Sequence, residues 1–404
     1  MPTFHYTARS PEGRVYRGAI DVDSKRALLE RLWEQDLVVL SVDVRGDGHQ
    51  RRFAVATPPV KARELVVFSR QLATMVSSGI PIVGALDVLA KPMKHRVLRE
   101  VVCRSRDEVE AGASLSEAMS RHPRVFSELF VNMVGAGESS GQLDDILDRL
   151  ASYLEKSEAL LRKVRSSLMY PAVVSCLAAG VTTFLMIVVV PKFKDIFNAL
   201  SGQLPLPTRL LIGFSEFLSK YLAVEVGLLF LGFLALRAYI RTDRGRLWFD
   251  RMKLRLPVFG ELFQKVAVAR FARTLATLNR AGIAILTSLE IVAKTIGNRV
   301  MERMILEARA SVKEGKLLSE PLAKHELFPA MAVHMIGVGE TTGKLDEMLG
   351  KIADFYESEV DTAAAGLTTL VEPIVISVLG VIVGAIAVAL LLPVFTIPTI
   401  VGAH

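Results

Sequence analysis

The chain has 404 residues, of which 51% are hydrophobic and 23% are charged, and its mean hydropathy is +0.38. A mean hydropathy above zero argues against an entirely water-soluble protein, and two cysteines, Cys103 and Cys176, exclude a disulfide framework. The net charge of +7 fits cytoplasmic Lys and Arg beside membrane spans better than binding to nucleic acid, which we do not expect.

The first 45 residues predict a small α+β module with the order β-β-α-β. Two β-rich runs around Gly13 indicate a hairpin, Ser24 can cap a helix, and a β-branched run follows. These elements are expected at Phe4–Ala8, Val15–Ile20, Lys25–Gln35 and Val38–Val44. Residues 46–60, rich in Gly, Arg and Pro, predict a linker. Because no apolar stretch opens the chain, we expect its N-terminus in the cytosol.

Residues 61–170 predict a bundle of about six helices. Apolar residues recur at helical spacing from Leu65 to Val76, and Ser77-Ser78-Gly79 breaks that pattern. A long helix is expected from Leu143 to Met169. It leads to Pro171, at the mouth of an apolar segment.

A second copy of this unit is expected at residues 241–371. With an offset of 203, Phe68-Ser-Arg-Gln-Leu-Ala-Thr-Met falls on Phe271-Ala-Arg-Thr-Leu-Ala-Thr-Leu. After one deletion, 8 of 16 positions between Asn132 and Leu147 are identical to their partners. Pro373 corresponds to Pro171, so the repeat predicts two units that each lead into a span.

Three membrane spans are predicted, at residues 171–191, 221–240 and 372–395. Ala172–Val190 and Pro373–Ala403 carry no charge, and Pro393 is the expected end of the last span. The middle span contains Glu225 and Arg237, but it is needed if the other two run in the same direction. Basic residues before the first span and after the second indicate that both bundles are cytosolic. Residues 192–220 and a tail at 396–404 would then be periplasmic.

The chain lacks a motif for chemistry, so no catalytic residue, cofactor or enzyme activity is predicted. Gly337 to Leu345 looks like a phosphate loop, but five residues separate Gly337 from Gly343 where four are needed, and Leu345 supplies no hydroxyl. His325-Glu326 opens like a zinc-protease motif, but Pro329 stands where the second His should be.

The repeated Gly-Glu-x-x-Gly-x-Leu-Asp motif is instead predicted to form a corner between two helices. Glycines permit the turn, and the aspartate favours the start of the next helix. The sequence leaves open whether the glutamate caps buried backbone or contacts a partner. The residues are Gly137, Glu138, Gly141, Leu143 and Asp144, and in the second copy Gly339, Glu340, Gly343, Leu345 and Asp346.

With this doubled motif, the chain resembles the polytopic platform proteins of bacterial type II secretion systems and type IV pilus machines. The junction from Lys163 through Tyr170-Pro171 to Pro191, and Leu204-Pro-Leu-Pro-Thr-Arg209, are also similar to that family. The resemblance implies a non-enzymatic scaffold in the inner membrane with its C-terminus in the periplasm. It also implies coupling of a cytosolic hexameric assembly ATPase to the assembly of pilin or pseudopilin subunits, together with other inner-membrane components of the machine.

The resemblance also makes Asp148 a candidate calcium ligand, since some members look able to bind calcium after the Gly-Glu turn. In the first unit Ser152 stands where the second carboxylate would be. In the repeat, Gly350 stands at the first position and Asp354 supplies a carboxylate at the second. Calcium needs several oxygen ligands, so we predict that neither unit binds it strongly.

Two other classes of function compete with the platform. A secondary transporter with repeated halves would place its symmetry and ionisable groups within the membrane, and a membrane enzyme would need one of the missing motifs. The basic segment Arg241–Arg255 predicts contact with either membrane lipid or the ATPase. Gly380 and Gly384 permit close approach of helices, and we expect a homo-oligomer. The sequence leaves open which machine the chain serves, a secretion system or a pilus.

Overall fold

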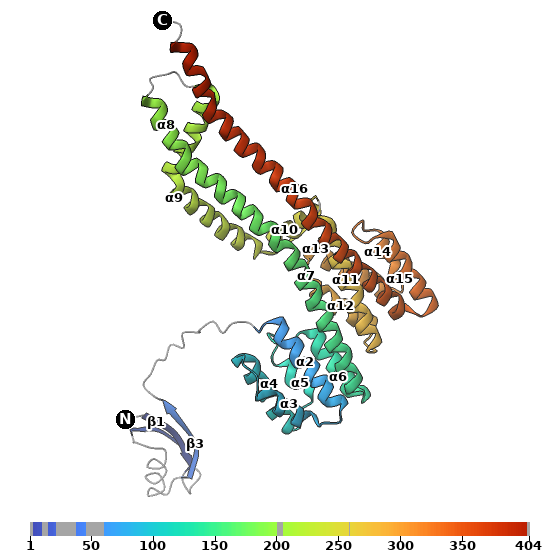
Figure 1. The fold of residues 1–404 in the computed structure, drawn as a ribbon. Coiled ribbons are helices and arrows are strands. Elements are labelled where there is room, and N and C mark those ends of the chain that lie inside the picture. Colours follow the sequence, from blue (N-terminus) through green and yellow to red (C-terminus); the bar gives the residue numbers. More distant parts are fainter. Residues whose placement is uncertain are drawn as a thin grey trace. The chain divides into compact units, whose positions relative to one another are not determined.

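The computed structural model describes residues 3–9, 15–21, 38–45, 60–199, 205–257 and 259–401 of the chain. By its backbone contacts the chain divides into two compact units, Met1–Pro59 and Val60–His404. The described part of the first unit is a β-sheet, and the described part of the second is helical (Figure 1).

The first unit contains an antiparallel sheet with the strand order β2-β1-β3. Its strands are β1 (Thr3–Arg9), β2 (Val15–Asp21) and β3 (Val38–Arg45). The register between β1 and β3 shifts between Thr7, which pairs with Ser41, and Ala8, which pairs with Val39. Such a shift bends a strand and strengthens its twist. The helix expected at Lys25–Gln35 lies outside the described residues.

Six helices form the first bundle in the described chain. They are α2 (Ala62–Ser77), α3 (Ile82–Ala90), α4 (Arg96–Glu110), α5 (Leu115–Ser120), α6 (Glu128–Ser140) and α7 (Leu143–Phe184). Gly79 ends α2 with φ of 82°, and Ile80 N donates to Met75 O at 3.0 Å. This left-handed cap satisfies carbonyls at the helix end and turns the chain, which glycine allows without strain.

The second bundle repeats this order. Its helices are α11 (Phe259–Arg280), α12 (Ile285–Thr295), α13 (Arg299–Lys313), α14 (Ser319–Ala323), α15 (Ala330–Thr342) and α16 (Leu345–Val401). The core repeats as well: Phe68 packs on Phe126 with ring centroids 6.1 Å apart, and Phe271 packs on Phe328 at 5.1 Å. The prediction of a mainly helical chain with two repeated units is therefore confirmed.

Long apolar helices follow each bundle. Among the described residues, Leu143–Ile196 and Leu345–Pro393 are long and apolar enough to cross a membrane. Helix α9 (Leu206–Ile240) consists of two halves, Leu206–Tyr221 and Val224–Ile240, which meet at a 68° bend. If the two halves form one crossing, α9 qualifies as a third span. Figure 1 shows α7 and α16 side by side.

The first apolar helix contains a π-helical turn, η1 (Leu185–Val189), before α8 (Val190–Ala199). In that turn each N–H bonds five residues back, and Val190 N donates to Leu185 O. Pro191 has no N–H for the next carbonyl, that of Met186. The Ser215 hydroxyl from α9 donates to this carbonyl instead, which satisfies a buried acceptor where water is scarce.

The structure adds detail at the end of the last expected span and in the segment between the first two. Helix α16 continues through Pro393 to Val401. Pro393 has no N–H for the carbonyl of Ala389, four residues earlier, and a hydroxyl from α9 satisfies that carbonyl instead. The segment expected to be periplasmic, residues 192–220, contains the end of α8 and the start of α9 among its described residues. Thr208 at the start of α9 donates to Ala389 O of α16 at 2.5 Å, so this segment ties the long helices together.

Candidate functional site

The Gly-Glu-x-x-Gly motif of the first bundle lies at the corner between α6 and α7. Gly141 has φ of 70° and caps α6, and Gln142 N donates to Gly137 O at 3.0 Å. A Cβ on Gly137 would lie 3.1 Å from the Leu143 Cα and 3.1 Å from the Ile146 Cβ. The first glycine therefore lets two helices approach, and the second lets the chain reverse.

The second bundle has the same corner between α15 and α16. Gly343 has φ of 71°, and a Cβ on Gly339 would lie 2.9 Å from the Leu345 Cα. Asp346 lies in the first turn of α16, as Asp144 does in α7, where a negative charge favours the N-terminus of a helix. This second corner is slightly tighter than the first.

Glu138 joins the corner to the start of α5. Its carboxylate accepts hydrogen bonds from Leu115 N at 2.5 Å, and from Ser116 N at 3.0 Å and Ser116 Oγ at 2.5 Å. The first N–H groups of a helix have no partner within the helix, so a carboxylate there satisfies donors that would otherwise be unpaired. In this geometry Glu138 caps backbone, which is one of the two alternatives that the sequence left open.

Glu340 makes the equivalent contacts in the second bundle. It accepts from Leu318 N at 2.5 Å, from Ser319 N at 3.0 Å and from Ser319 Oγ at 2.9 Å. Phosphate binding would need backbone amides open to an anion. Here Gly343 caps the end of α15, and the amides of Leu318 and Ser319 at the start of α14 already donate to Glu340 and are not open to an anion.

Asp148, the candidate calcium ligand, forms an ion pair with Arg70. Arg70 Nη1 lies 2.5 Å from Asp148 Oδ1, and the same guanidinium binds both carboxylate oxygens of Glu155 at 2.7 Å. Hydrogen bonds from Arg70 lower the pKa of Glu155 below its ordinary value. Among the described residues no group of three His, Cys, Asp or Glu side chains is placed to hold a metal ion.

Arg273 has the same role in the second bundle with a different set of carboxylates. It binds Asp354 at 2.5 Å and Glu357 at 2.8 Å, and its side chain is 13% exposed, against 33% for Arg70. Burial acts to raise the pKa of Asp354, but hydrogen bonding and the charges of Arg273 and Lys156 outweigh it and lower that pKa. Sequence reasoning missed both arginines. The signal was present, since Arg occupies the third position of both aligned Phe-x-Arg segments.

Contacts across α7 join the two bundles. The Tyr153 hydroxyl lies 3.1 Å from Thr274 Oγ1, and burial raises the pKa of this tyrosine. Ion pairs connect Lys156 to Asp354 at 3.4 Å and Lys163 to Asp361 at 2.5 Å. The bundles therefore share a polar and charged interface, and most of its ion pairs are exposed to solvent.

The basic segment Arg241–Arg255 contains helix α10 (Asp243–Arg255). The buried Asp250 fixes it, because it accepts a hydrogen bond from Arg299 N at the start of α13 at 3.0 Å. Its exposed face carries Arg244, Trp248 and Arg251 at helical spacing. Trp248 packs on Tyr239 at the end of α9, with ring centroids 6.4 Å apart. An exposed row of arginines with tryptophan fits anionic partners, both lipid headgroups and acidic protein surfaces.

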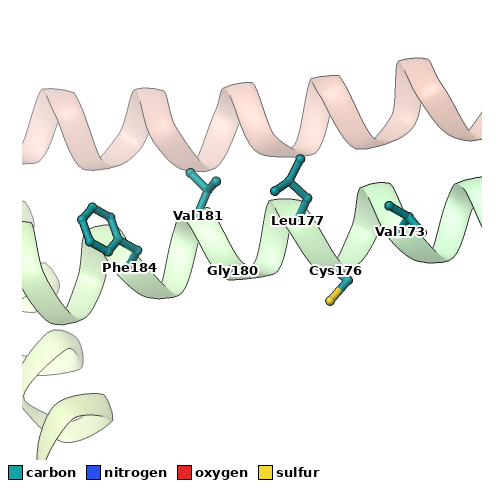
Figure 2. Close-up of a pocket in the computed structure, with 6 residues that line it drawn as sticks. All are labelled: Val173, Cys176, Leu177, Gly180, Val181 and Phe184. Atoms are coloured by element: carbon teal, nitrogen blue, oxygen red, sulfur yellow. The ribbon is translucent and has the colours of Figure 1, made fainter.

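An apolar groove of about 560 Å³ lies along α7 beyond Pro171. Its lining residues are Val173, Cys176, Leu177, Gly180, Val181 and Phe184. Figure 2 shows Leu177 and Val181 pointing toward α16, whereas Cys176 points away from it. Pro171 is buried within α7 and Pro373 is exposed within α16, and both lie inside continuous helices at the start of the apolar parts. The groove has the character of a surface that faces lipid or another apolar helix.

Comparisons with known proteins agree with the repeat. The model of the family "Type II secretion system (T2SS), protein F" matches residues 68–191 and again residues 271–393, and that of its N-terminal domain matches residues 1–43. The chain is 44% identical to the type IV pilus assembly protein PilC of Thermus thermophilus, over 98% of each chain. It is 34% identical to the type II secretion system protein F of Vibrio cholerae, also over 98% of each chain.

Proposed function

Because the chain belongs to the type II secretion system protein F family, we propose that it is an assembly platform for the filament of a type IV pilus or a type II secretion system. The observation that carries the proposal is the doubling of the helical bundle. Each bundle leads into a long apolar helix, and α7 and α16 run side by side in the same direction. Such an arrangement would hold two large polar units against one face of a membrane.

We place the chain in the inner membrane with three spans, its N-terminus in the cytosol and its C-terminus in the periplasm. Two parallel spans require a return crossing, and the bent helix α9 is the segment that can provide it. Residues 61–170 and 241–371 would then be the cytosolic bundles, and residues 1–45 a third cytosolic module. The excess of Arg in and around α10 favours its cytosolic placement.

In this proposal the chain performs no chemistry, and it couples a cytosolic assembly ATPase to the addition of pilin or pseudopilin subunits. The charged surfaces of the bundles would then be available to the ATPase, and the apolar groove of α7 would be available to membrane-embedded subunits. The exposed face of α10 remains a candidate for ATPase or lipid contact.

Cross-linking in living cells tests this function. Cysteines placed at Arg244 and Arg251 on α10, in a chain without Cys103 and Cys176, should capture the assembly ATPase when filaments are being built. A cysteine at Glu326, an exposed position elsewhere on the second bundle, is the matched control. Loss of filaments on deletion, and their return with the wild-type chain, would support the platform. Intact filament assembly in the deletion strain, or solute transport by the reconstituted protein, would refute it and favour a transporter.

A further inference from the structure

The two bundles of one chain meet through different surfaces. The first contributes Tyr153 of α7, and the second contributes Thr274 of α11. Arg149 of α7 also donates to the carbonyl of Arg280 at the end of α11, at 3.3 Å. The joint is therefore formed by the α7 face of one bundle and the α11 face of the other.

The repeat gives every residue of this joint a counterpart. Tyr153 corresponds to Phe355 with the offset of 202, and Thr274 corresponds to Gln71 with the offset of 203. A two-fold arrangement would bring Phe355 onto Gln71 within the same chain. Instead Phe355 is 45% exposed and Gln71 is also exposed. The joint is thus heterologous, and each bundle retains one unused surface.

The unused surface of the first bundle contains a cavity. A cavity of about 340 Å³ opens beside Val67 and Gln71. Apolar side chains, among them Phe68, Leu89 and Leu98, line it together with Arg63, Glu64, Lys94 and His95. Val67 is 49% exposed. In the second bundle the counterpart of Val67 is Arg270, whose guanidinium lies near Gly297 and close to Tyr153. The surface that receives Tyr153 is therefore filled and covered, whereas its counterpart is open and has apolar side chains with a charged rim.

The unused surface of the second bundle carries a projecting aromatic residue, Phe355. Phe355 lies on the solvent side of α16, one turn after Lys351, which is the counterpart of Arg149. Phe355 and Lys351 therefore keep on α16 the two features that α7 uses in the joint, an aromatic ring and a basic residue one turn before it. Exposed aromatic side chains that meet an apolar pocket contribute strongly to association.

The directions of the helices allow this joint to be repeated. Lys156 pairs with Asp354, and seven residues later Lys163 pairs with Asp361, so α7 and α16 run parallel. The two bundles are therefore related without a reversal of direction along these helices. If the same relation places a second copy, its long helices keep their direction and both copies lie in one membrane.

We propose that a second copy of this chain docks head to tail, with Phe355 of one copy seated in the cavity beside Val67 and Gln71 of the next. The contact would bring together, between chains, the counterparts of the two faces that form the joint within the chain. It follows from the packing of the bundles alone and does not depend on the proposed function.

Cysteine cross-linking of two differently tagged copies tests the contact in native membranes. The full chain carries Cys103→Ser and Cys176→Ser, with Phe355→Cys in one copy and Val67→Cys in the other. We expect a cross-linked product that contains both tags, and little product when either variant is present alone. Three results would overturn the proposal: no mixed product, an equally strong product from Phe355→Cys alone, or capture of a different protein by Val67→Cys.

A second measurement counts chains per particle in detergent by light scattering. Val67→Glu, which puts a carboxylate at the mouth of the cavity, and Phe355→Glu, which removes the ring, should each weaken self-association about thirtyfold, as expected for loss of a central aromatic anchor. Leu306→Glu on α13, at a site that is 41% exposed and outside both surfaces, is the control. Unchanged self-association in both variants would contradict the proposal.

Discussion

The two bundles share a corner but differ in the charges beside it. In the first, Arg70 binds Asp148 and Glu155; in the second, Arg273 binds Asp354 and Glu357. The glutamates correspond in the repeat, but the aspartates do not. Because an ion pair needs only a carboxylate within reach, its position along a helix can shift by one turn. A glycine pressed against backbone has no such freedom, and this explains why the corner is duplicated so closely.

Glycine variants at the corner should give the largest difference in stability between the two bundles. Gly339→Ala should destabilise the second bundle by about 2 kcal/mol, since its Cβ would press on the backbone of α16. Gly137→Ala should cost less, because its closest contacts are at 3.1 Å rather than 2.9 Å. Hydrogen exchange of the full chain in detergent, read separately over α15–α16 and α6–α7, measures both.

Gly135→Ala is the matched control within α6. A Cβ there meets only Ser116 atoms at 3.5 Å, and replacing a helical glycine by alanine then stabilises by about 0.5 kcal/mol. Equal effects of Gly135→Ala and Gly137→Ala would show that close approach is not what the corner requires.

The next effect should come from the two glutamates, and here the bundles should behave alike. Glu138→Ala and Glu340→Ala each leave two helix-end amides without their acceptor, which costs about 2 kcal/mol. Faster exchange at residues 115–116 and 318–319 would report it. Glu326→Ala, at an exposed carboxylate, serves as the control. If these two variants left hydrogen exchange unchanged but abolished binding of a partner protein, the glutamates would be partner-contact residues and not caps.

A smaller effect should separate the two arginines. Arg273→Gln should cost about 2 kcal/mol and Arg70→Gln about 1 kcal/mol, because solvent screens the more exposed pair. Denaturant unfolding of the full chain in detergent, followed by hydrogen exchange in each bundle, compares the two. A larger loss from Arg70→Gln would mean that burial does not set the strength of these clusters.

The smallest effect is a dependence on pH. Glu155 has a folded pKa below its ordinary 4.5, and Asp354 has one below its ordinary 3.8. Each contributes stability that is complete above the ordinary value and is lost as pH falls through the lowered value. Thermal unfolding between pH 5 and pH 3 should therefore show a decline that Arg70→Gln makes shallower in the first bundle. The same decline in the variant would argue against the Arg70 contacts.

Sequence alone predicted the helices, the repeat and the corner because these depend on local patterns. Helical periodicity from Leu65 to Val76 and glycines at 79 and 112 are properties of neighbouring residues. The partners of Glu138 and Arg70 could not be predicted in the same way, because Ser116 and Glu155 are distant along the chain. The continuation of α16 beyond Pro393 could not be predicted in this way either, because the Ala389 carbonyl that Pro393 frees is bound by Thr208, which is distant along the chain.

The central claim is that both bundles lie on the same side of the membrane, and cysteine labelling tests it most directly. Ser139→Cys and Thr341→Cys occupy equivalent exposed positions at the two corners, and Leu206→Cys lies at the start of α9, where the side chain is 71% exposed. In a chain without Cys103 and Cys176, a membrane-impermeant maleimide should label only Leu206→Cys from the periplasm. It should label both corner cysteines in inverted vesicles. Labelling of the two corners from opposite sides would contradict the account.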